Sequence, residues 1–527
     1  MIKPINPLTK EGFRVKAKIQ RQLRAAKRRI ERRLDKRKLG DCSRPVLTGA
    51  NLQFEMAERT RGMSYGGLGA IVLLVRQLGL AEAIDRRLHL LKMHLPYHES
   101  DHVLNLAYNA LCDGTCLEDI ELRRNDEVFL DALGARRIPD PTTAGDFCRR
   151  FRPSDVRTLL DVFHEARRKV WAGQPAEFFA EARIDVDGTL VATTGQCKGG
   201  MDIAYNGTWG YHVLVLSLAN TGEVLSLVNR SGNRPSHEGA AEEIDRVLTV
   251  CFGGGFRRVL VRGDTDFTQT KHLDRWDDDQ RVRFIFGIDC MGNLLTLADD
   301  LPENVWTPLD RPLRYQVKTQ PRARPRNVKE QIIRERGFKN IRLESEEVAE
   351  FDYRPTACKK TYRLIALRKN LRVRDEQGQL FDDYRYFFYI TNDRESTPAE
   401  IVFSANDRCD QENLHAQLKG GVRALQAPVD NLVSNGAWMA MASLAWNLKA
   451  WLALSLAERA GAAGEQDRDA KRTVLRMEFK TFVNAFIRLP CQIVNTSRMI
   501  VYRLLGWNRW LDVFFRLVEQ LRRPLRC

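Results

Sequence analysis

The chain lacks the features that would cross-link it or hold a structural metal. Its 11 cysteines are scattered, with no CxxC pair and no cysteine–histidine cluster at zinc-binding spacing. Cys112 and Cys116 are four positions apart and have no partner pair nearby. This spacing excludes a small disulfide framework and suits a reducing cytoplasm, where we expect the protein to act. The first ten residues lack the apolar core of a signal peptide.

Long hydrophobic runs are also scarce. One segment, Ala437 to Ala457, is apolar enough to raise the possibility of a membrane span. It contains Asn447 and Lys449 and follows a turn rich in glycine and asparagine. We interpret it as a buried core helix, so we expect no membrane association through it. A chain of 527 residues is long enough to bury large cores in two to four domains of roughly 100–200 residues each.

Acidic residues are outnumbered by basic ones, 68 against 84, which gives a formal charge of +16. This excess favours a polyanionic partner, with nucleic acid as the first expectation and an anionic membrane surface as the competing one. Residues 1–45 alone carry 16 Lys and Arg against 4 Asp and Glu. We expect this basic arm to become a helix or an ordered arm only on a phosphate backbone, although a solvated tail is the alternative. Its candidate phosphate ligands are Arg28, Arg29, Arg32 and Arg33.

The apolar periodicity divides the rest of the chain. Residues 46–178 show helical spacing and are predicted to form a helical, DNA-binding region. Residues 179–289 then predict three antiparallel strands, the second and third joined by a hairpin turn at 220–222. A helix, a strand, a second helix at 269–279 and a last strand are predicted to follow. This order is that of the RNase H-like fold, and it is also common to α/β proteins in general. The remaining predicted parts are a mostly β insertion at 290–400, a return to the core with a helix at 406–419 within 401–460, and a basic helical region at 461–527.

Three acidic residues stand where they could hold divalent metal. Asp187 lies in the first predicted strand, Asp264 follows the fourth, and Glu412 lies on the helix after the insertion. Phosphodiester transfer uses two divalent ions, which bind carboxylate oxygens supplied by rigid elements. Asp185 and Asp266 are acidic neighbours of the first two, and position in the pattern favours Asp187 and Asp264 over them.

The predicted helix at 406–419 adds basic residues near the third acid. Arg408, Glu412, His415 and Lys419 would share one face of a continuous helix, with metal at the centre and phosphate on both sides. Arg262, just before Asp264, is a further candidate for phosphate binding.

Simpler interpretations of each motif remain open. Either aspartate could cap a turn or helix, and the charges at 408–419 could form ordinary surface ion pairs. The order strand-Asp, strand-Asp, helix-Glu in a basic chain is less expected by chance than any one of them.

At these residues the chain resembles bacterial insertion-sequence DDE transposases. The likeness lies in Asp187 to Thr189, in Val261 to Phe267, and in the spacing of Arg408, Glu412 and Lys419. The group called insertion sequence thirteen-eighty is the nearest by pattern. The third motif of these proteins begins with a tyrosine, where this chain has Ala405, and that departure leaves the role of the tyrosine near the phosphate unfilled.

The resemblance implies an RNase H-like catalytic core and two Mg²⁺ or Mn²⁺ ions held by the three acids. It implies binding to the terminal inverted repeats of an element, assembly as a homodimer in a synaptic complex, and cleavage followed by strand transfer into target DNA. Arg408 and Lys419 would then hold phosphate. Trp306, in the predicted insertion, is a candidate for base stacking, although a core role is the alternative.

Three other functions fit parts of the same pattern. A transposase-derived repressor would bind DNA without cutting it, but the three candidate acids are all present. A metal-dependent nuclease would cut without joining, using the same ions. An interaction scaffold would need none of the acids.

Overall fold

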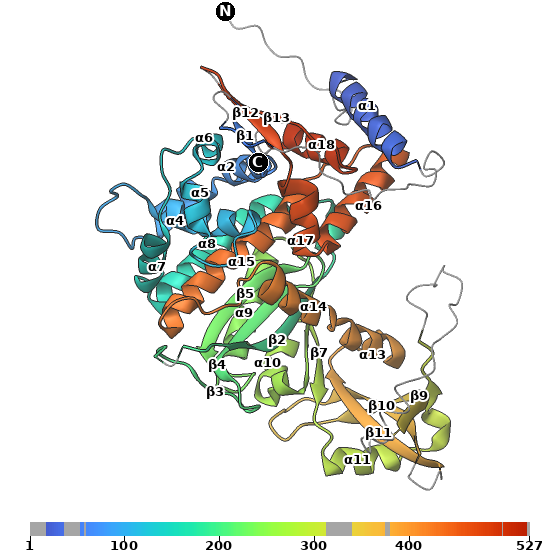
Figure 1. Ribbon diagram of the computed structural model, residues 1–527. Coiled ribbons are helices and arrows are strands. Elements are labelled where there is room, and N and C mark those ends of the chain that lie inside the picture. Colours follow the sequence, from blue (N-terminus) through green and yellow to red (C-terminus); the bar gives the residue numbers. More distant parts are fainter. Residues whose placement is uncertain are drawn as a thin grey trace, which may run out of the picture. The chain divides into compact units, whose positions relative to one another are not determined.

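The computed structural model describes residues 17–35, 53–56, 60–195, 197–311, 340–374, 380–497 and 499–523. The chain is a mixed α/β protein that divides into two compact units (Figure 1). Unit 1 comprises Met1–Ala176, Thr189–Arg234 and Asn413–Cys527, and unit 2 comprises Glu177–Gly188 and Pro235–Glu412. The strand β2 (Ala182–Ala192) and the helix α14 (Asp410–Ala416) each contain a point where the chain passes from unit 2 to unit 1.

Unit 1 is mainly helical. Its α-helices are α1 (Ala17–Arg33), α2 (Leu68–Leu78), α3 (Leu80–Arg87), α4 (Glu99–Leu111), α5 (Ile120–Arg124), α6 (Glu127–Leu133), α7 (Pro141–Arg149), α8 (Pro153–Trp171), α15 (Leu432–Leu454), α16 (Ala462–Arg476), α17 (Phe479–Phe482) and α18 (Leu511–Leu521). Its strands, besides the end of β2, are β1 (Gly62–Met63), β3 (Asp202–Ile203), β4 (Trp209–Leu218), β5 (Glu223–Ser231), β12 (Cys491–Asn495) and β13 (Ile500–Leu504). The hairpin predicted at residues 220–222 joins β4 and β5, which pair antiparallel.

The helix α15 forms the centre of unit 1. Every residue from Ser434 to Leu454 is buried, and the helix packs against β5, α4, α8 and α16 (Figure 1). The interpretation of this apolar run as a buried core helix is therefore confirmed, with the helix ending at Leu454. Among the described residues, no helix has both the length and the apolar character needed to cross a bilayer.

The helix α1 comes from the predicted basic arm. Ala17–Arg33 is helical, and the expectation that the arm orders only on a phosphate backbone stays a prediction. Residues 1–16 and 36–45 of the predicted arm lie outside the described residues. Since α1 contains no buried residue, its arginines face solvent.

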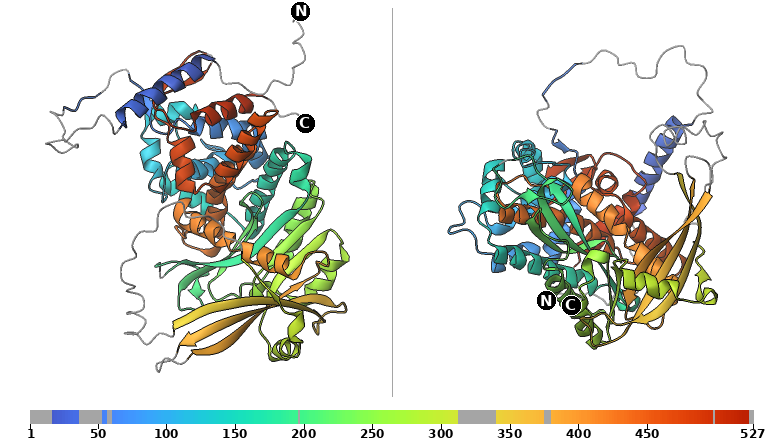
Figure 2. Two further views of the ribbon diagram at one scale, coloured as in Figure 1. Left: turned by 90° about the vertical axis from the view of Figure 1, so that its right-hand side faces the viewer. Right: turned by 90° about the horizontal axis from the view of Figure 1, so that it is seen from below.

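Unit 2 contains one mixed sheet covered by short helices. Its strands follow the order β2, β6 (Val259–Gly263), β7 (Val282–Ile288), β11 (Leu380–Thr391), β10 (Tyr362–Arg374), β9 (Asn340–Tyr353) and β8 (Thr307–Pro308). The first three strands are parallel, and the others are antiparallel to their neighbours. Figure 2 shows the three long strands β9, β10 and β11 running together in yellow and orange.

The helices of unit 2 are α9 (Ala240–Gly253), α10 (Leu273–Asp278), α11 (Gly292–Asp299) and α13 (Pro398–Asp407), with α14 beginning at Asp410. The α-helix expected at 269–279 is wrong in its first half: two 3₁₀ turns, η3 (Thr265–Phe267) and η4 (Thr270–His272), precede α10. A third 3₁₀ turn is η5 (Glu303–Val305), while η2 (Ala176–Phe179) lies where the chain enters unit 2. An apolar cluster that includes Leu260, Ile285, Ile365 and Ile401 packs α13 against the sheet.

Candidate active site

The register of two parallel strands brings the predicted aspartates to one edge of the sheet. In the pairing of β2 with β6, Ala182 faces Val259 and Asp185 faces Arg262, a constant offset of 77 residues. Continued by two residues, the same offset sets Asp187 beside Asp264. Asp264 directly follows the end of β6 at Gly263, and Asp187 lies within β2 just past the last residue of β2 that pairs with β6. Ligands commonly bind at the carboxyl ends of the strands in α/β sheets.

Asp187 is a partly buried carboxylate among other charges. Its side chain is 16% exposed, and one oxygen accepts a hydrogen bond of 2.8 Å from the Gly188 amide. Burial raises the pKa of Asp187 to about 6; the Arg408 guanidinium opposes this rise, and the negative charges of Asp264 and Glu412 add to it. Asp264 and Glu412 therefore both act electrostatically on Asp187.

Asp264 performs two tasks at once. Its Oδ1 accepts a hydrogen bond of 3.1 Å from the Asp266 amide and so caps the turn η3, as the capping alternative predicted. Its Oδ2 faces Arg408 Nη2 at 4.0 Å, and its side chain is 37% exposed. Burial is the main cause that raises the pKa of Asp264. Capping with one oxygen leaves the other available at the sheet edge.

Arg408 lies between the two aspartates. Its Nη1 is 3.6 Å from Asp187 Oδ2, and its side chain is 18% exposed. Both of its ion pairs exceed ordinary hydrogen-bond length, and within the described residues its guanidinium makes no hydrogen bond. A partly exposed guanidinium that makes no hydrogen bond of its own has N–H groups available to an anion.

Glu412 lies in the first turn of α14, as a helical residue, and its side chain is exposed. Two hydrogen bonds position the segment before it. Arg262 Nη1 donates to the Ser404 carbonyl at 2.8 Å, and Gln411 Nε2 donates to the Asp185 carbonyl at 3.2 Å. These bonds tie both sides of Arg408 to the strands that carry the aspartates.

The continuous helix expected at 406–419 is corrected by the structure. The helix α13 ends at Asp407, Arg408 lies in the following turn, and α14 spans Asp410–Ala416 before a π-helix, η6 (Gln417–Gly421). Arg408 and Lys419 are therefore not on one α-helical face with Glu412, and His415 is buried. Lys419 is exposed and belongs to unit 1.

Arg262 also requires a correction. Its side chain is 3% exposed, and it grips Asp185 through bonds of 2.7 Å and 3.0 Å. With its third bond to Ser404, the guanidinium is committed to the protein and has no exposed edge for a phosphate. It is a positioning residue. The sequence contains a sign of this pair, because Asp185 and Arg262 each precede a candidate aspartate by two residues.

The Trp306 side chain is buried and packs against neighbouring side chains of unit 2. It is 7% exposed, contacts the ring of Tyr386, and carries the Arg368 guanidinium 4.3 Å from its ring centroid. This position favours the core alternative over base stacking. The four candidate arginines of α1, in contrast, are exposed; they are Arg28, Arg29, Arg32 and Arg33.

The chemistry of the three acids fits a hard divalent cation. All three supply carboxylate oxygens, the ligands that Mg²⁺ and Mn²⁺ prefer, and the negative charges of Asp264 and Glu412 disfavour ionisation of Asp187. A cation among them would relieve this repulsion. Among the described residues, no group of three or more His, Cys, Asp or Glu side chains is arranged so that it could hold a metal ion. The three acids are thus of the residue type that binds Mg²⁺ or Mn²⁺, but the structure does not gather them into a metal-binding group.

The sequence profile described as transposase DDE domain group 1 matches residues 57–524. The chain belongs to this family. The expectation of a DDE transposase is confirmed at that level, and DNA transposition is the activity that goes with it. No curated protein matches the chain.

Several chains of solved structures are similar to this chain. One of them is from the cryo-EM structure of a piggyBac transposase synaptic complex with hairpin DNA, 11% identical, with 80% of this chain and 82% of that chain covered at a TM-score of 0.34.

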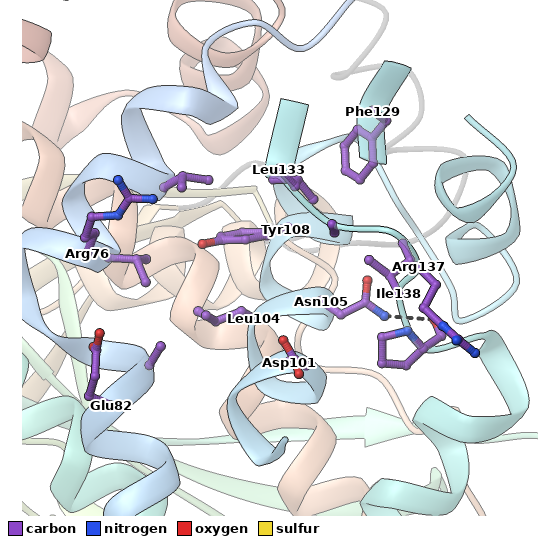
Figure 3. Close-up of a pocket in the computed structure, with 15 residues that line it drawn as sticks. Arg76, Glu82, Asp101, Leu104, Asn105, Tyr108, Phe129, Leu133, Arg137 and Ile138 are labelled. Atoms are coloured by element: carbon purple, nitrogen blue, oxygen red, sulfur yellow. Dashed lines mark hydrogen bonds between the residues drawn. The ribbon is translucent and has the colours of Figure 1, made fainter. Parts of the chain in front are cut away.

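A separate cavity of about 260 Å³ lies in unit 1 between α2, α3, α4 and α6 (Figure 3). Its wall is mostly apolar, and Asn105 donates a hydrogen bond of 3.1 Å to the Pro139 carbonyl there. Arg76 and Arg137 are balanced by Glu82 and Asp101 around it. Such a cavity lacks the excess charge of one sign that would attract a phosphate or a metal ion.

Proposed function

We propose that this chain cleaves DNA at the ends of a mobile element and joins the cut 3′ ends to a target. The observation that carries the proposal is the strand register that brings Asp187 and Asp264 to one edge, with Glu412 in electrostatic contact with Asp187. In this proposal the three residues are the metal ligands of an RNase H-like core. The assignment to the insertion sequence thirteen-eighty group belongs to the same proposal and rests on the motifs alone.

In this proposal the residues at the site have three different roles: metal binding, phosphate binding and positioning. Asp187, Asp264 and Glu412 would hold two Mg²⁺ or Mn²⁺ ions, which when bound activate the attacking oxygen and stabilise the leaving one. Arg408 has unsatisfied donors and would bind a phosphate oxygen near the cut. Arg262 and Gln411 would keep Arg408 in place through their bonds to neighbouring elements.

Contacts remote from the cut would come from the basic surface. The exposed arginines of α1 would bind phosphates without reading sequence, and each neutralised phosphate would add to the salt dependence of binding. Lys419 is a candidate for the same task. A homodimer holding two element ends is the assembly that we propose.

The test uses a labelled duplex that carries an end of the DNA element encoding the chain, with purified protein and Mg²⁺. We expect nicking at the end, and we expect Asp187→Asn, Asp264→Asn or Glu412→Gln to lower its rate by about 10³-fold or more while DNA affinity stays within a few-fold.

Asp266→Asn is the matched control, because Asp266 is an exposed acid two residues from Asp264. It should cut at nearly the wild-type rate. Normal cutting by the three variants would refute the site. Binding without cutting in any divalent metal would support a repressor, and cutting without joining would support a nuclease.

A further inference from the structure

Tyr389 stands beside the acidic edge of unit 2, although it comes from the β-rich insertion. It lies on β11, opposite Gly287 of β7 and opposite Ile365 of β10. Directly paired residues of antiparallel strands project from the same face of a sheet. A Cβ atom on Gly287 would lie 3.0 Å from the Thr265 amide nitrogen and 3.3 Å from the Asp264 carbonyl carbon. The Tyr389 ring is therefore on the face crossed by the Asp264 segment.

The same side chain packs beside the segment that leads to Arg408. Tyr389 and Ala405 both contact the apolar cluster that contains Ile365, Ile401 and Val402. Ala405, where the resemblance places a tyrosine, contributes only a methyl group. Tyr389 thus brings a phenol ring to the surroundings of residue 405 from a different element.

The Tyr389 hydroxyl lies in the field of two cations. Arg408 and Arg311 both interact with it electrostatically, while burial raises the pKa of Tyr389 above its ordinary value of 10.0. The hydroxyl therefore keeps its proton at neutral pH and can donate a hydrogen bond.

The two nearby cations differ in their partners. Arg311 is neutralised by Glu346, to which its Nη2 donates at 2.9 Å. Arg408 has long ion pairs of 3.6 Å and 4.0 Å, with no hydrogen bond within the described residues. A hydroxyl donor within electrostatic range of a guanidinium that makes no hydrogen bond of its own can bind the same oxyanion as that guanidinium.

We propose that Tyr389 and Arg408 together hold the phosphate of the DNA strand to be cut, with the Tyr389 hydroxyl donating to a non-bridging oxygen. This inference rests on the proposed function, and it assigns to the insertion a substrate contact at the reacting phosphate.

The test compares Tyr389→Phe with Tyr384→Phe under single-turnover conditions on the same labelled duplex with Mg²⁺. Tyr384 is the matched control, because it lies on the same strand, projects from the opposite face, and is 48% exposed. We expect Tyr389→Phe to slow nicking by about tenfold or more, the value of one hydrogen bond to a charged group, with an unchanged melting temperature and DNA affinity within about twofold. Tyr384→Phe should cut at the wild-type rate.

A second measurement reports the contact without cleavage. Ethylation of the phosphate at the cut should weaken DNA binding by the wild-type protein, and it should weaken binding by Tyr389→Phe less, while interference at other phosphates stays the same. A wild-type nicking rate with an unchanged interference pattern in Tyr389→Phe would overturn the inference. If neither the wild type nor Tyr384→Phe cuts, the proposed function fails, and the interference pattern still decides the Tyr389 contact.

Discussion

The buried acid Glu223 of unit 1 and the three acids Asp187, Asp264 and Glu412 of unit 2 differ in how their carboxylate oxygens are hydrogen-bonded. In unit 1, Glu223 is fully buried and accepts hydrogen bonds from Arg167 Nε at 2.9 Å, Trp451 Nε1 at 2.8 Å, Trp171 Nε1 at 3.1 Å and Thr221 Oγ1 at 2.6 Å. These donors tie β5 to α8 and α15. Every lone pair that burial would otherwise leave unsatisfied has a partner.

The acids of unit 2 are arranged in the opposite way. Asp187 has Asp264 and Glu412 as electrostatic neighbours, and Arg408 approaches Asp187 and Asp264 only at 3.6 Å and 4.0 Å. Such an arrangement costs stability, and a bound cation would remove the cost. A carboxylate whose hydrogen bonds are complete, such as Glu223, stabilises the fold. A carboxylate whose pKa is raised by neighbouring carboxylates, such as Asp187, is suited to bind a cation.

The largest expected effect is the loss of DNA nicking when an acid of unit 2 is neutralised. Asp187→Asn should lower nicking by about 10³-fold, close to 4 kcal/mol of transition-state stabilisation, because it removes a proposed metal ligand. Its melting temperature should be unchanged or higher, since a buried charge among like charges is lost. The checks are single-turnover nicking and calorimetry on the same preparation. A large fall in melting temperature would show that Asp187 is structural.

Next in size is the converse change in unit 1. Glu223→Gln should lower the free energy of unfolding by roughly 3 kcal/mol, because Arg167 would remain buried without its ion-pair partner. Denaturant titration measures the loss. Nicking per folded molecule should be unchanged, and a selective loss of nicking at full stability would break the distinction between the groups.

A divalent cation should stabilise the protein by binding to the acids of unit 2 and not through Glu223 of unit 1. At a Mg²⁺ concentration ten times its dissociation constant, the free energy of unfolding should rise by about 1.4 kcal/mol in the wild type. The rise should persist in the less stable Glu223→Gln and vanish in Asp187→Asn. Melting curves with and without Mg²⁺ provide the measurement, and equal rises in all three proteins would mean that Mg²⁺ binds elsewhere.

The last prediction concerns a buried lysine in unit 1. Lys449 donates to the Leu475 carbonyl at 2.8 Å and lies 3.9 Å from the Trp446 ring, and burial lowers its pKa to about 7. Between pH 7 and the unfolded value near 10.5, the unfolded state binds more protons, so stability should rise with pH by at most about 1.4 kcal/mol per unit.

Lys449→Met should remove this pH dependence. Below pH 7, the variant should also lack the loss of stability that burial of the charged Lys449 causes in the wild type. Denaturant midpoints from pH 7 to pH 9 test the difference between the two proteins. An equal slope in both would assign the pH dependence to other groups.

Much of the fold was predictable because the pattern of apolar and polar residues in each element lies within a short stretch of sequence. The alternation in β2, the hairpin of β4 and β5, and the apolar run of α15 each contain their own pattern. The candidate acids were also recognisable, since residue type and element order are both written in the chain. The break after Asp407 was not, because the surrounding residues have helical periodicity, and the turn at Arg408 is defined by backbone hydrogen bonds and by the long-range bond from Arg262 to Ser404.

The sequence by itself determined which groups could do chemistry: three acids on predictable elements, and a basic arginine near the last of them. The tertiary structure alone decided their partners. It committed Arg262 to Asp185, left the donors of Arg408 available, and brought Tyr389 of the insertion to the edge where Asp264 lies. The physical reason is that a side chain's partner depends on strand register and long-range packing, which no local pattern of residues specifies.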